Sequence, residues 1–357
     1  MLVSGVALSQ PMGGVRRHNM ELLPRVGERL AASGGQLAIL EGRDGIPFPL
    51  PECIERIPSS VPARHPALRA LHESRALERL ARESAASGTP YDFIHTAHFP
   101  APRSLSVPMS VTVHDLRSFD LEHTPISRRL LARGFVGPAL ERAARVFTVS
   151  ESVRTSLANH WPVTQDKTFV VPNAPDHFEP LPRSASADAP ILHIGHLEKR
   201  KNVQLLIEAL ALDETLPDVL LAGAPKHGED ERLSALASQF GVRERVHFHG
   251  AFADEELPRL YANAACVVLP SHLEGFGIAV LEAQRARVPL AVSTAGALTE
   301  VAGTGVPSFA PNDAAACATA IHAALARSSA DIDSDASAAQ RFTWDASADA
   351  WVAGWSS

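Results

Sequence analysis

The chain has 357 residues, of which 45% are hydrophobic and 20% are charged, and its formal net charge is −7. This composition is typical of a globular protein, and the length predicts two domains because it exceeds one ordinary hydrophobic core. No apolar run approaches the roughly 20 residues of a membrane-spanning helix. The three cysteines lie far apart without C-x-x-C spacing, which argues against a disulfide framework and against a zinc site.

The start of the chain predicts a cytoplasmic protein, because residues 1–8 lack the charged leader and the cleavage site of a signal peptide. The acidic excess lies in the second half, whereas the first half is mildly basic. A simple solvated surface explains such a small excess of basic residues. An anionic acceptor or weak peripheral contact with the inner face of a membrane is the alternative.

The first half alternates between strand-like and helical patterns, which predicts a parallel sheet covered by helices. The first strand is expected at residues 2–8, followed by Gly13 and Gly14 and a helix. This loop has neither the G-x-G-x-x-G spacing nor the lysine of a P-loop. His114 and Asp115 end a later strand, where a histidine is either structural or faces a ligand. Further strands are expected at residues 37–40, 93–96, 110–114, 146–149 and 168–171.

The second half begins after residues 175–190, which are rich in Pro, Ser and Ala and are expected to link the domains. A strand at 191–195 then precedes the cations Lys199, Arg200 and Lys201. The default explanation for such a cluster is a run of charged residues on a solvated surface. Asn202 is expected to cap the next helix. Further strands are expected at 219–221, 246–248, 266–269 and 288–293, a flexible surface loop at 331–339, and a closing helix at 346–355.

Residues 270–283 read Pro-Ser-His-Leu-Glu-Gly-Phe-Gly-Ile-Ala-Val-Leu-Glu-Ala and change from a strand end to a helix. Glu274 is expected on the turn, beside helix N–H groups that favour an anionic ligand. Gly275 and Gly277 leave the backbone open to close approach. Glu282 follows about two helical turns later and can point toward the same cleft. The alternative is that both carboxylates only complement the helix N-terminus and a solvated face.

This segment resembles the donor-sugar motif of the family-4 retaining glycosyltransferases, which have the GT-B fold. The resemblance implies that Glu274 contacts the transferred sugar and that Glu282 holds the nucleotide ribose. The run G-H-L-E-K-R-K-N resembles the motif whose Arg and Lys, here Arg200 and Lys201, hold the donor diphosphate. The context V-T-V-H-D implies that His114 faces the sugar.

The remaining implied contacts with the donor come from loops. Gly-Gly-Val-Arg resembles the loop that faces the diphosphate across the cleft, and the turn after the strand at 246–248 borders the base pocket. The chain departs from the family pattern at Ala174 and Arg287, where Gly is usual, and at Gln284, where Met is common. We expect a slightly different backbone turn at Ala174, and altered packing rather than lost chemistry at Arg287 and Gln284. The implied donor-binding residues of these loops and of the central motif are Gly13, Gly14, Gly250, Ala251, Gly275, Phe276 and Gly277.

The implied fold is α/β, with two Rossmann-like domains facing across a cleft. The acceptor domain comprises residues 1–178 with a returning helix at 342–357, and the donor domain comprises residues 188–341. The implied activity is metal-independent transfer of a hexose, without any cofactor beyond the nucleotide sugar. GDP-mannose is the expected donor, and UDP- and dTDP-sugars stay open. The acceptor is a hydroxyl of a glycan, a lipid-linked sugar or a small molecule, in surface polysaccharide or glycoconjugate synthesis, and no nucleic acid partner is expected.

Two other functions are compatible with the same patterns. A non-catalytic protein that binds a sugar nucleotide would keep the fold and the motifs without turnover. A dinucleotide-dependent oxidoreductase would also have two Rossmann-like domains, although the G-x-G-x-x-G sequence is missing.

Overall fold

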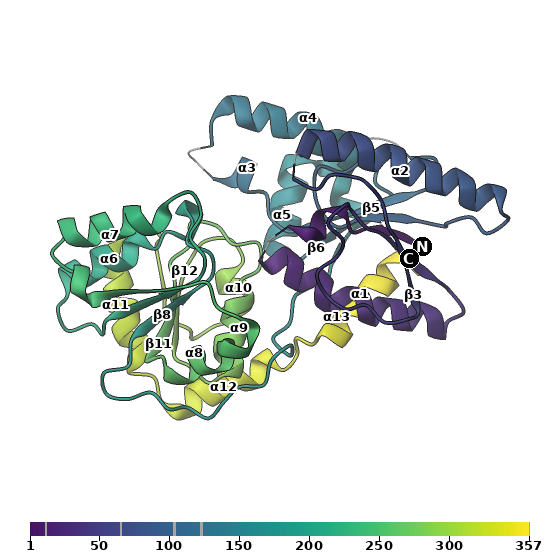
Figure 1. Ribbon diagram of the computed structural model, residues 1–357. Coiled ribbons are helices and arrows are strands. Elements are labelled where there is room, and N and C mark those ends of the chain that lie inside the picture. The colour runs from purple at the N-terminus through teal and green to yellow at the C-terminus, as the bar shows by residue number, and fades with distance from the viewer. Residues whose placement is uncertain (11–12, 65, 103–104, 122–123, 357) are drawn as a thin grey trace. The chain divides into compact units, whose positions relative to one another are not determined.

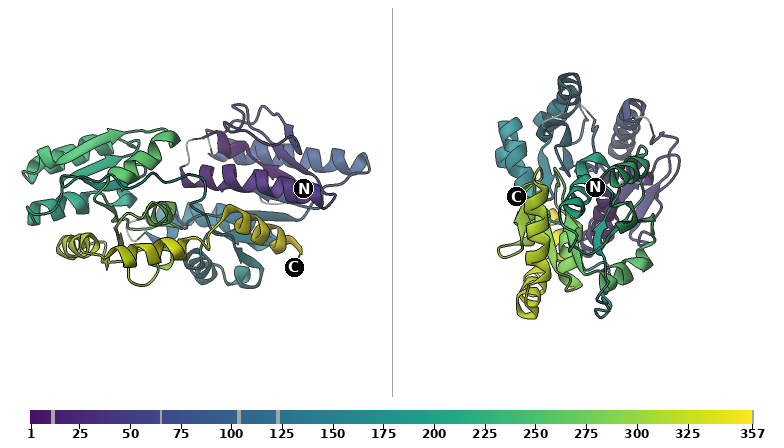
Figure 2. Two further views of the ribbon diagram at one scale, coloured as in Figure 1. Left: turned by 90° about the horizontal axis from the view of Figure 1, so that it is seen from below. Right: turned by 90° about the vertical axis from the view of Figure 1, so that its left-hand side faces the viewer.

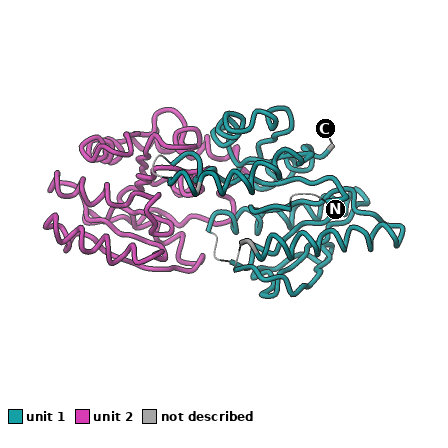
Figure 3. The backbone as a smooth tube through the Cα atoms, turned by 90° about the horizontal axis from the view of Figure 1, so that it is seen from above, with its two compact units in different colours: residues 1–173, 344–357 teal, residues 174–343 magenta. Residues whose placement is uncertain are grey.

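The computed structural model describes residues 1–10, 13–64, 66–102, 105–121 and 124–356. The chain forms two compact units, residues 1–173 with 344–357 and residues 174–343 (Figure 3). Each unit contains a parallel sheet with helices on both faces (Figure 1, Figure 2). The predicted α/β fold with two Rossmann-like domains is therefore confirmed.

The first unit is built on a seven-stranded sheet of order β3-β2-β1-β4-β5-β6-β7. The chain runs outward from β1 to β3 and then returns to the other side of β1 with β4. Ligands of open parallel sheets bind at such a switch point, outside the carboxyl ends of the strands. The strands are β1 (Leu2–Ser4), β2 (Leu37–Leu40), β3 (Ile54–Ile57), β4 (Ile94–Thr96), β5 (Met109–Val113), β6 (Arg145–Thr148) and β7 (Thr168–Val170); the helices are α1 (Gly14–Ala32), α2 (Pro66–Ala86), α3 (Arg117–Asp120), α4 (Ile126–Arg142), α5 (Glu151–His160) and α13 (Trp344–Ser356).

Successive residues of a strand face opposite layers of the first unit, as the geometry of a strand requires. Leu2 packs into the core under α2, whereas Val3 packs into the core under α1. Helix α13 returns from the far end of the sequence and packs against α1, as predicted. Its Trp351 is fully buried and shares a core with Leu22 and Val26 of α1.

The chain leaves the first unit after Asn173 and returns to it at Trp344. Both residues contact the buried His18 of α1. The Nδ1 atom of His18 lies 2.8 Å from Oδ1 of Asn173, and its ring packs edge-on against the Trp344 indole with centroids 6.0 Å apart. In addition, Ser347 Oγ donates to the carbonyl of Pro172 at 2.7 Å. One helix therefore holds both ends of the first unit where the chain crosses.

The second unit is built on a six-stranded sheet of order β10-β9-β8-β11-β12-β13. Its switch point lies between β8 and β11. Helices α6, α7 and α11 share one core with alternate residues of β11, Cys266 and Val268. The strands are β8 (Ile191–Ile194), β9 (Val219–Ala222), β10 (Val246–Gly250), β11 (Cys266–Leu269), β12 (Leu290–Ser293) and β13 (Ser308–Phe309); the helices are α6 (Gln204–Leu212), α7 (Glu229–Gln239), α8 (Leu257–Asn263), α9 (Ile278–Arg285), α10 (Leu298–Ala302), α11 (Ala314–Leu325) and α12 (Ser329–Ala339).

One strand prediction in the first unit was wrong, and one strand was missed. The strand expected at residues 2–8 ends at Ser4, because Gly5 donates to the carbonyl of Leu40 and the chain then turns into a 3-10 helix, Val6–Ser9. The apolar run there reflects burial of the 3-10 helix rather than a longer strand. Strand β3 was not predicted, since Glu55 and Arg56 at its centre are exposed at the sheet edge.

The loop predicted at residues 331–339 is instead helix α12. The hydroxyl of Ser328 accepts from the backbone N–H of Asp331, whose carboxylate returns to Ser328 in a capping box. Asp333 and Asp335 form ion pairs with arginines, and the small face of α12 packs against α9. The prediction failed because this segment has few apolar residues, whereas the helix is stabilised by its cap and by its ion pairs.

Arg287 explains one departure from the family pattern. Its backbone is left-handed, with φ of 53°, the conformation for which Gly is the usual residue. The Arg287 guanidinium contacts Asp333 of α12, with Nε 2.7 Å from Oδ1. The side chain thus adds a contact at a position where the backbone favours Gly.

Segment 175–190 contains no helix or strand and is attached to the second unit. The ring of Phe178 stacks on Tyr261 of α8 with centroids 5.8 Å apart. Arg183 Nη1 donates to the carbonyl of Tyr261 at 2.9 Å, and Ser184 Oγ donates to Asn263 at 2.6 Å. The extended segment therefore packs along one helix.

Helix α4 exposes Ile126, Leu130 and Leu131, with side chains between 64% and 75% accessible. Arg133 is exposed on the same helix. No helix within the described part of the chain combines the length and the apolar composition needed to cross a bilayer.

Candidate active site

Two loops meet at the switch point of the second sheet. One follows β8 and carries Arg200 and Lys201, and the other follows β11 and carries Glu274. Because β8 and β11 are adjacent parallel strands, their carboxyl ends lie at the same edge. The backbone N–H of His272 donates to the carbonyl of Arg200 at 2.8 Å and joins the two loops directly.

Glu274 is the centre of a buried charge cluster and is only 8% exposed. Its Oε2 accepts from Arg200 Nη1 at 3.0 Å. Its Oε1 accepts from Lys201 Nζ and, at 2.9 Å, from Ser271 Oγ. A second carboxylate, Glu198, lies 2.9 Å from Nη2 of Arg200. The two cations predicted to hold phosphate therefore contact the carboxylate predicted to hold the sugar.

These cations set the protonation of Glu274. Burial by itself would raise the pKa of Glu274, but Lys201 and Arg200 outweigh it and hold the pKa at about 2. The carboxylate is ionised at neutral pH, and so low a pKa makes it a poor general base. Its chemical capacity is to accept hydrogen bonds and to balance positive charge.

Two residues without a predicted ligand role hold the cluster in place. Asn202 is left-handed and buried, and its Nδ2 donates to the carbonyls of Pro270 at 3.0 Å and Pro311 at 2.7 Å. It does not cap α6, so the predicted cap was wrong. Gly296 brings the loop after β12 so close that a Cβ there would lie 2.2 Å from the carbonyl oxygen of Glu274. The only sign of this role in the sequence is that Gly296 follows shortly after the predicted strand at 288–293.

Glu282 lies on α9 and has different partners from Glu274. Its carboxylate is 9% exposed, and its Oε2 accepts from the Tyr261 hydroxyl at 2.6 Å. Its Oε1 lies 2.9 Å from Nε2 of His177, a contact at ion-pair distance that lacks the alignment of a hydrogen bond. Neither Tyr261 nor His177 was predicted, since no spacing in the sequence relates them to Glu282.

The glycines and the phenylalanine of the central motif differ in what they offer a ligand. Gly277 has φ of 92° and precedes the first turn of α9, where free N–H groups are expected. Phe276 is buried, and its ring packs edge-on against Phe342 with centroids 5.9 Å apart. The ring of Phe276 is therefore part of the core, and the part of the motif that can face a ligand is the backbone at the start of α9.

Gly250 and Ala251 lie at the carboxyl end of β10, two strands away from β8. Gly250 has φ of 80°, and its carbonyl accepts from the N–H of Gly223 at 2.8 Å. Ala251 is exposed. These two residues belong to the same sheet edge as Arg200 and Glu274.

In the first unit, Gly13 and Gly14 begin α1, and His114 follows β5. The ring of His18, one turn into α1, packs edge-on against the His114 ring with centroids 5.0 Å apart. The His114 ring is hydrogen-bonded to the backbone of Ala97. Its Nε2 is buried and has no hydrogen-bond partner among the residues that the structure describes.

Histidines cluster around this point of the first unit. Burial lowers the pKa of His18 to about 4 and the pKa of His95 to about 3. Desolvation also lowers the pKa of His98 to about 4 and places the pKa of His114 well below its ordinary value. All four rings are consequently neutral at pH 7, and a neutral ring offers one donor and one acceptor nitrogen.

We expect the stability of the folded protein to fall as pH drops from about 6.5 toward 4. In this range His18 and His95 take up protons in the unfolded chain but stay neutral where they are buried in the folded protein. Above pH 6.5 these residues should leave the free energy of unfolding unchanged. Thermal unfolding between pH 8 and 4.5 measures the trend, and ring-proton NMR should show both rings neutral at pH 5.5. Replacing exposed His72 by Gln is the control and should not alter the profile. Titration of His18 or His95 near pH 6.5 would contradict the expectation.

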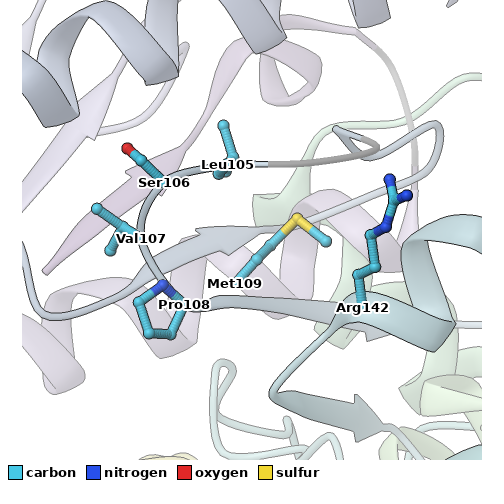
Figure 4. A pocket seen from close by; sticks show the side chains of 6 residues that line it. All are labelled: Leu105, Ser106, Val107, Pro108, Met109 and Arg142. Atoms are coloured by element: carbon cyan, nitrogen blue, oxygen red, sulfur yellow. The ribbon is translucent and has the colours of Figure 1, made fainter.

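A pocket of about 290 Å³ lies at the amino end of β5 (Figure 4). This is the opposite end of the strand from His114, so the pocket is separate from the sheet edge at which the predicted residues lie. Its lining residues are Leu105, Ser106, Val107, Pro108, Met109 and Arg142.

Comparison with known families matches both halves of the chain. Residues 12–177 match the model described as Glycosyltransferase Family 4, and residues 182–341 match the model described as Glycosyl transferases group 1. The two matches follow one another along the chain and together span most of the sequence.

Individual relatives agree with these matches. The chain is 28% identical over 333 residues to O-antigen chain mannosyltransferase B of Escherichia coli, covering 86% of this chain and 85% of that protein. The sucrose-phosphate synthase of Thermosynechococcus elongatus has a similar fold, with a TM-score of 0.72, 22% identity and coverage of 97% and 96%. HepE of Anabaena, solved in complex with UDP and glucose, gives a TM-score of 0.71, 21% identity and coverage of 100% and 99%.

Proposed function

Because the chain belongs to the family-4 glycosyltransferases of the GT-B fold, we propose that it transfers a hexose from a nucleoside diphosphate sugar to a hydroxyl acceptor with retention of configuration. The observation that carries this proposal is the cluster of Arg200, Lys201 and Glu274 at the switch point of the second sheet. It combines cations for a leaving diphosphate with an ionised acceptor for sugar hydroxyls.

The demanding step is departure of the nucleoside diphosphate, which gains negative charge as the glycosidic bond breaks. Arg200 and Lys201 stabilise that charge, together with the N–H groups at the start of α9. A preorganised donor of this kind typically contributes ~2.7–4 kcal/mol to the transition state. The cations Arg200, Lys201 and Lys226 form ion pairs with two carboxylates, Glu198 and Glu274, which leaves one excess positive charge among these five side chains.

Retention requires no dedicated base in this proposal. The departing phosphate takes the proton of the acceptor hydroxyl, while Glu274 orients the sugar ring. The low pKa of Glu274, about 2, supports this role because the carboxylate stays ionised. His114 faces the sugar in this proposal. Its Nε2 is buried and has no hydrogen-bond partner among the described residues, so it can accept a hydrogen bond from a sugar hydroxyl once movement of its surroundings exposes it. Phosphate neutralisation by side chains makes the reaction metal-independent in this proposal.

GDP-mannose is the first choice of donor, since a relative that matches 86% of this chain is named as a mannosyltransferase. UDP-glucose is the main alternative, because HepE has been solved with UDP and glucose. The acceptor is a hydroxyl of a growing glycan or a related glycoconjugate. Contact with a membrane surface stays a prediction, and the exposed side chains of α4 are the place to test it by sedimentation with anionic vesicles.

We expect GDP to raise the unfolding temperature more than UDP, dTDP or ADP does. A ligand at 100 times its dissociation constant stabilises the folded state by ~2.7 kcal/mol, which a thermal-shift assay detects readily. Release of GDP from GDP-mannose then separates an enzyme from a protein that only binds the nucleotide. A larger shift with UDP would move the donor to a UDP-sugar. No shift with any of the four nucleotides would contradict the proposed function.

A further inference from the structure

Glu282 receives both of its side-chain partners from outside its own helix. Tyr261 comes from α8, and His177 comes from the segment that follows the chain crossing at Asn173. We propose that His177 is a positioning residue that holds Glu282 in the orientation needed to bind the nucleotide ribose. This inference rests on the proposed function and on the ribose contact that the family resemblance implies for Glu282.

The geometry around the carboxylate leaves room for a ribose. A carboxylate has about four lone-pair sites, two on each oxygen. Tyr261 occupies one site on Oε2, and His177 lies against Oε1 at 2.9 Å. Each oxygen of Glu282 thus keeps a further acceptor site. The 2′ and 3′ hydroxyls of a ribose are donors and could bind both oxygens without displacing either neighbour.

The neighbours of Glu282 are themselves fixed. The side chain of His177 is only 1% exposed, so its ring has little freedom to turn. Its Nδ1 lies 3.3 Å from the carbonyl oxygen of Ala174, while Nε2 faces Glu282. Because a carbonyl and a carboxylate only accept, the ring holds both partners when both of its nitrogens are protonated, as an ion pair with Glu282 requires. Burial and Glu282 raise the pKa of Tyr261 well above its ordinary value, so the phenol stays a donor.

The contact that restrains His177 is made with Ala174, which lies where the chain passes from the first unit to the second. Ala174 is the first residue of the second unit, and Asn173 before it is bonded to His18 in the first unit. A short stretch of backbone therefore connects the anchor of the first unit with the carboxylate of the second. His177 couples the position of Glu282 to the conformation of this crossing segment.

The test compares two substitutions that preserve different nitrogens of the ring. His177→Gln places an amide NH₂ near the position of Nε2, whereas His177→Asn places it near Nδ1 and withdraws it from Glu282. Calorimetry measures the dissociation constants of GDP and of 2′,3′-dideoxy-GDP, or of the UDP pair if UDP binds more tightly. The ratio of the two constants reports recognition of the ribose hydroxyls separately from the diphosphate.

For the wild type we expect GDP to bind about tenfold more tightly than its dideoxy analogue, because hydroxyls bonded to a charged group are lost in the analogue. His177→Asn should weaken the binding of GDP and leave the affinity for the dideoxy nucleotide unchanged, so that the ratio of the two dissociation constants approaches one. His177→Gln should restore most of the ratio. Tyr261→Phe removes the other partner of Glu282 and should also lower the ratio.

Equal weakening of both nucleotides by His177→Asn would show a purely structural role and overturn the inference, as would an unchanged ratio in a folded variant. A wild type that binds both nucleotides equally would remove the ribose role of Glu282 and overturn the inference, while leaving the proposed function intact. A wild type that binds no nucleotide would instead contradict the proposed function itself.

Discussion

Alanine in place of both Arg200 and Lys201 should lower the affinity for the nucleoside diphosphate by about 10²-fold or more, since each charge-assisted hydrogen bond contributes ~1.5–3 kcal/mol. Sugar transfer should fall further. The same two groups meet more negative charge in the transition state, and the loss of one such donor typically costs about 10²- to 10³-fold in kcat. Calorimetry with the diphosphate and initial rates with the sugar nucleotide measure the two effects separately.

The structure supplies a matched control for this double variant. Lys199 belongs to the same run of cations but is exposed, so Lys199→Ala should leave affinity and rate nearly unchanged. Removing Arg200 and Lys201 also strands the buried carboxylate of Glu274. A triple variant that adds Glu274→Gln removes this complication and should still fail to bind. Wild-type affinity in the folded triple variant would refute the phosphate assignment.

Glu274→Gln and Glu282→Gln should fail in different ways, because the two carboxylates have different neighbours. Glu274→Gln should lower turnover by about 10²-fold or more through loss of an interaction at the reacting sugar. Its affinity for the free diphosphate should be kept or raised, since Arg200 and Lys201 lose their competing anion. Glu282→Gln should instead lower the affinity for the free nucleoside diphosphate itself.

Nucleotide binding and initial rates on the two purified variants decide between the roles. Exposed Glu255 provides the control substitution in the same unit, and Glu255→Gln should change neither quantity. If Glu274→Gln loses nucleotide affinity and Glu282→Gln does not, the two roles are reversed. If both variants behave like the wild type, the motif is structural and the proposed chemistry has lost its main support.

The sequence was informative wherever a residue's place follows from the end of a strand. Arg200 and Glu274 each follow a buried apolar run, and parallel strands bring such positions to one edge, so their proximity could be anticipated. The ion pairs between them could not, because they depend on how two loops fold back over each other. Asn202 and Gly296, which hold those loops, gave no more than a weak local signal.

Contacts made by irregular backbone were beyond the reach of periodicity. His177 lies in a Pro- and Ala-rich stretch that has no apolar period, and its contact with Glu282 depends on the path of the chain after Asn173. The helix α12 illustrates a different limit. Its capping residues, Ser328 and Asp331, were visible in the sequence, but its small buried side chains resemble those of a loop.

The packing of α13 against α1 affects the order in which the protein matures on the ribosome. Phe147, Leu22 and Val26 share their core with Trp351, which is translated only after the whole of residues 174–343. At typical rates of synthesis this interval lasts roughly 10–30 s. The second unit is continuous in sequence and can fold within that time, whereas the core of the first unit is incomplete without Trp351. We therefore expect Leu22, Val26 and Phe147 of a nascent chain to lack their Trp351 partner until α13 has been synthesised.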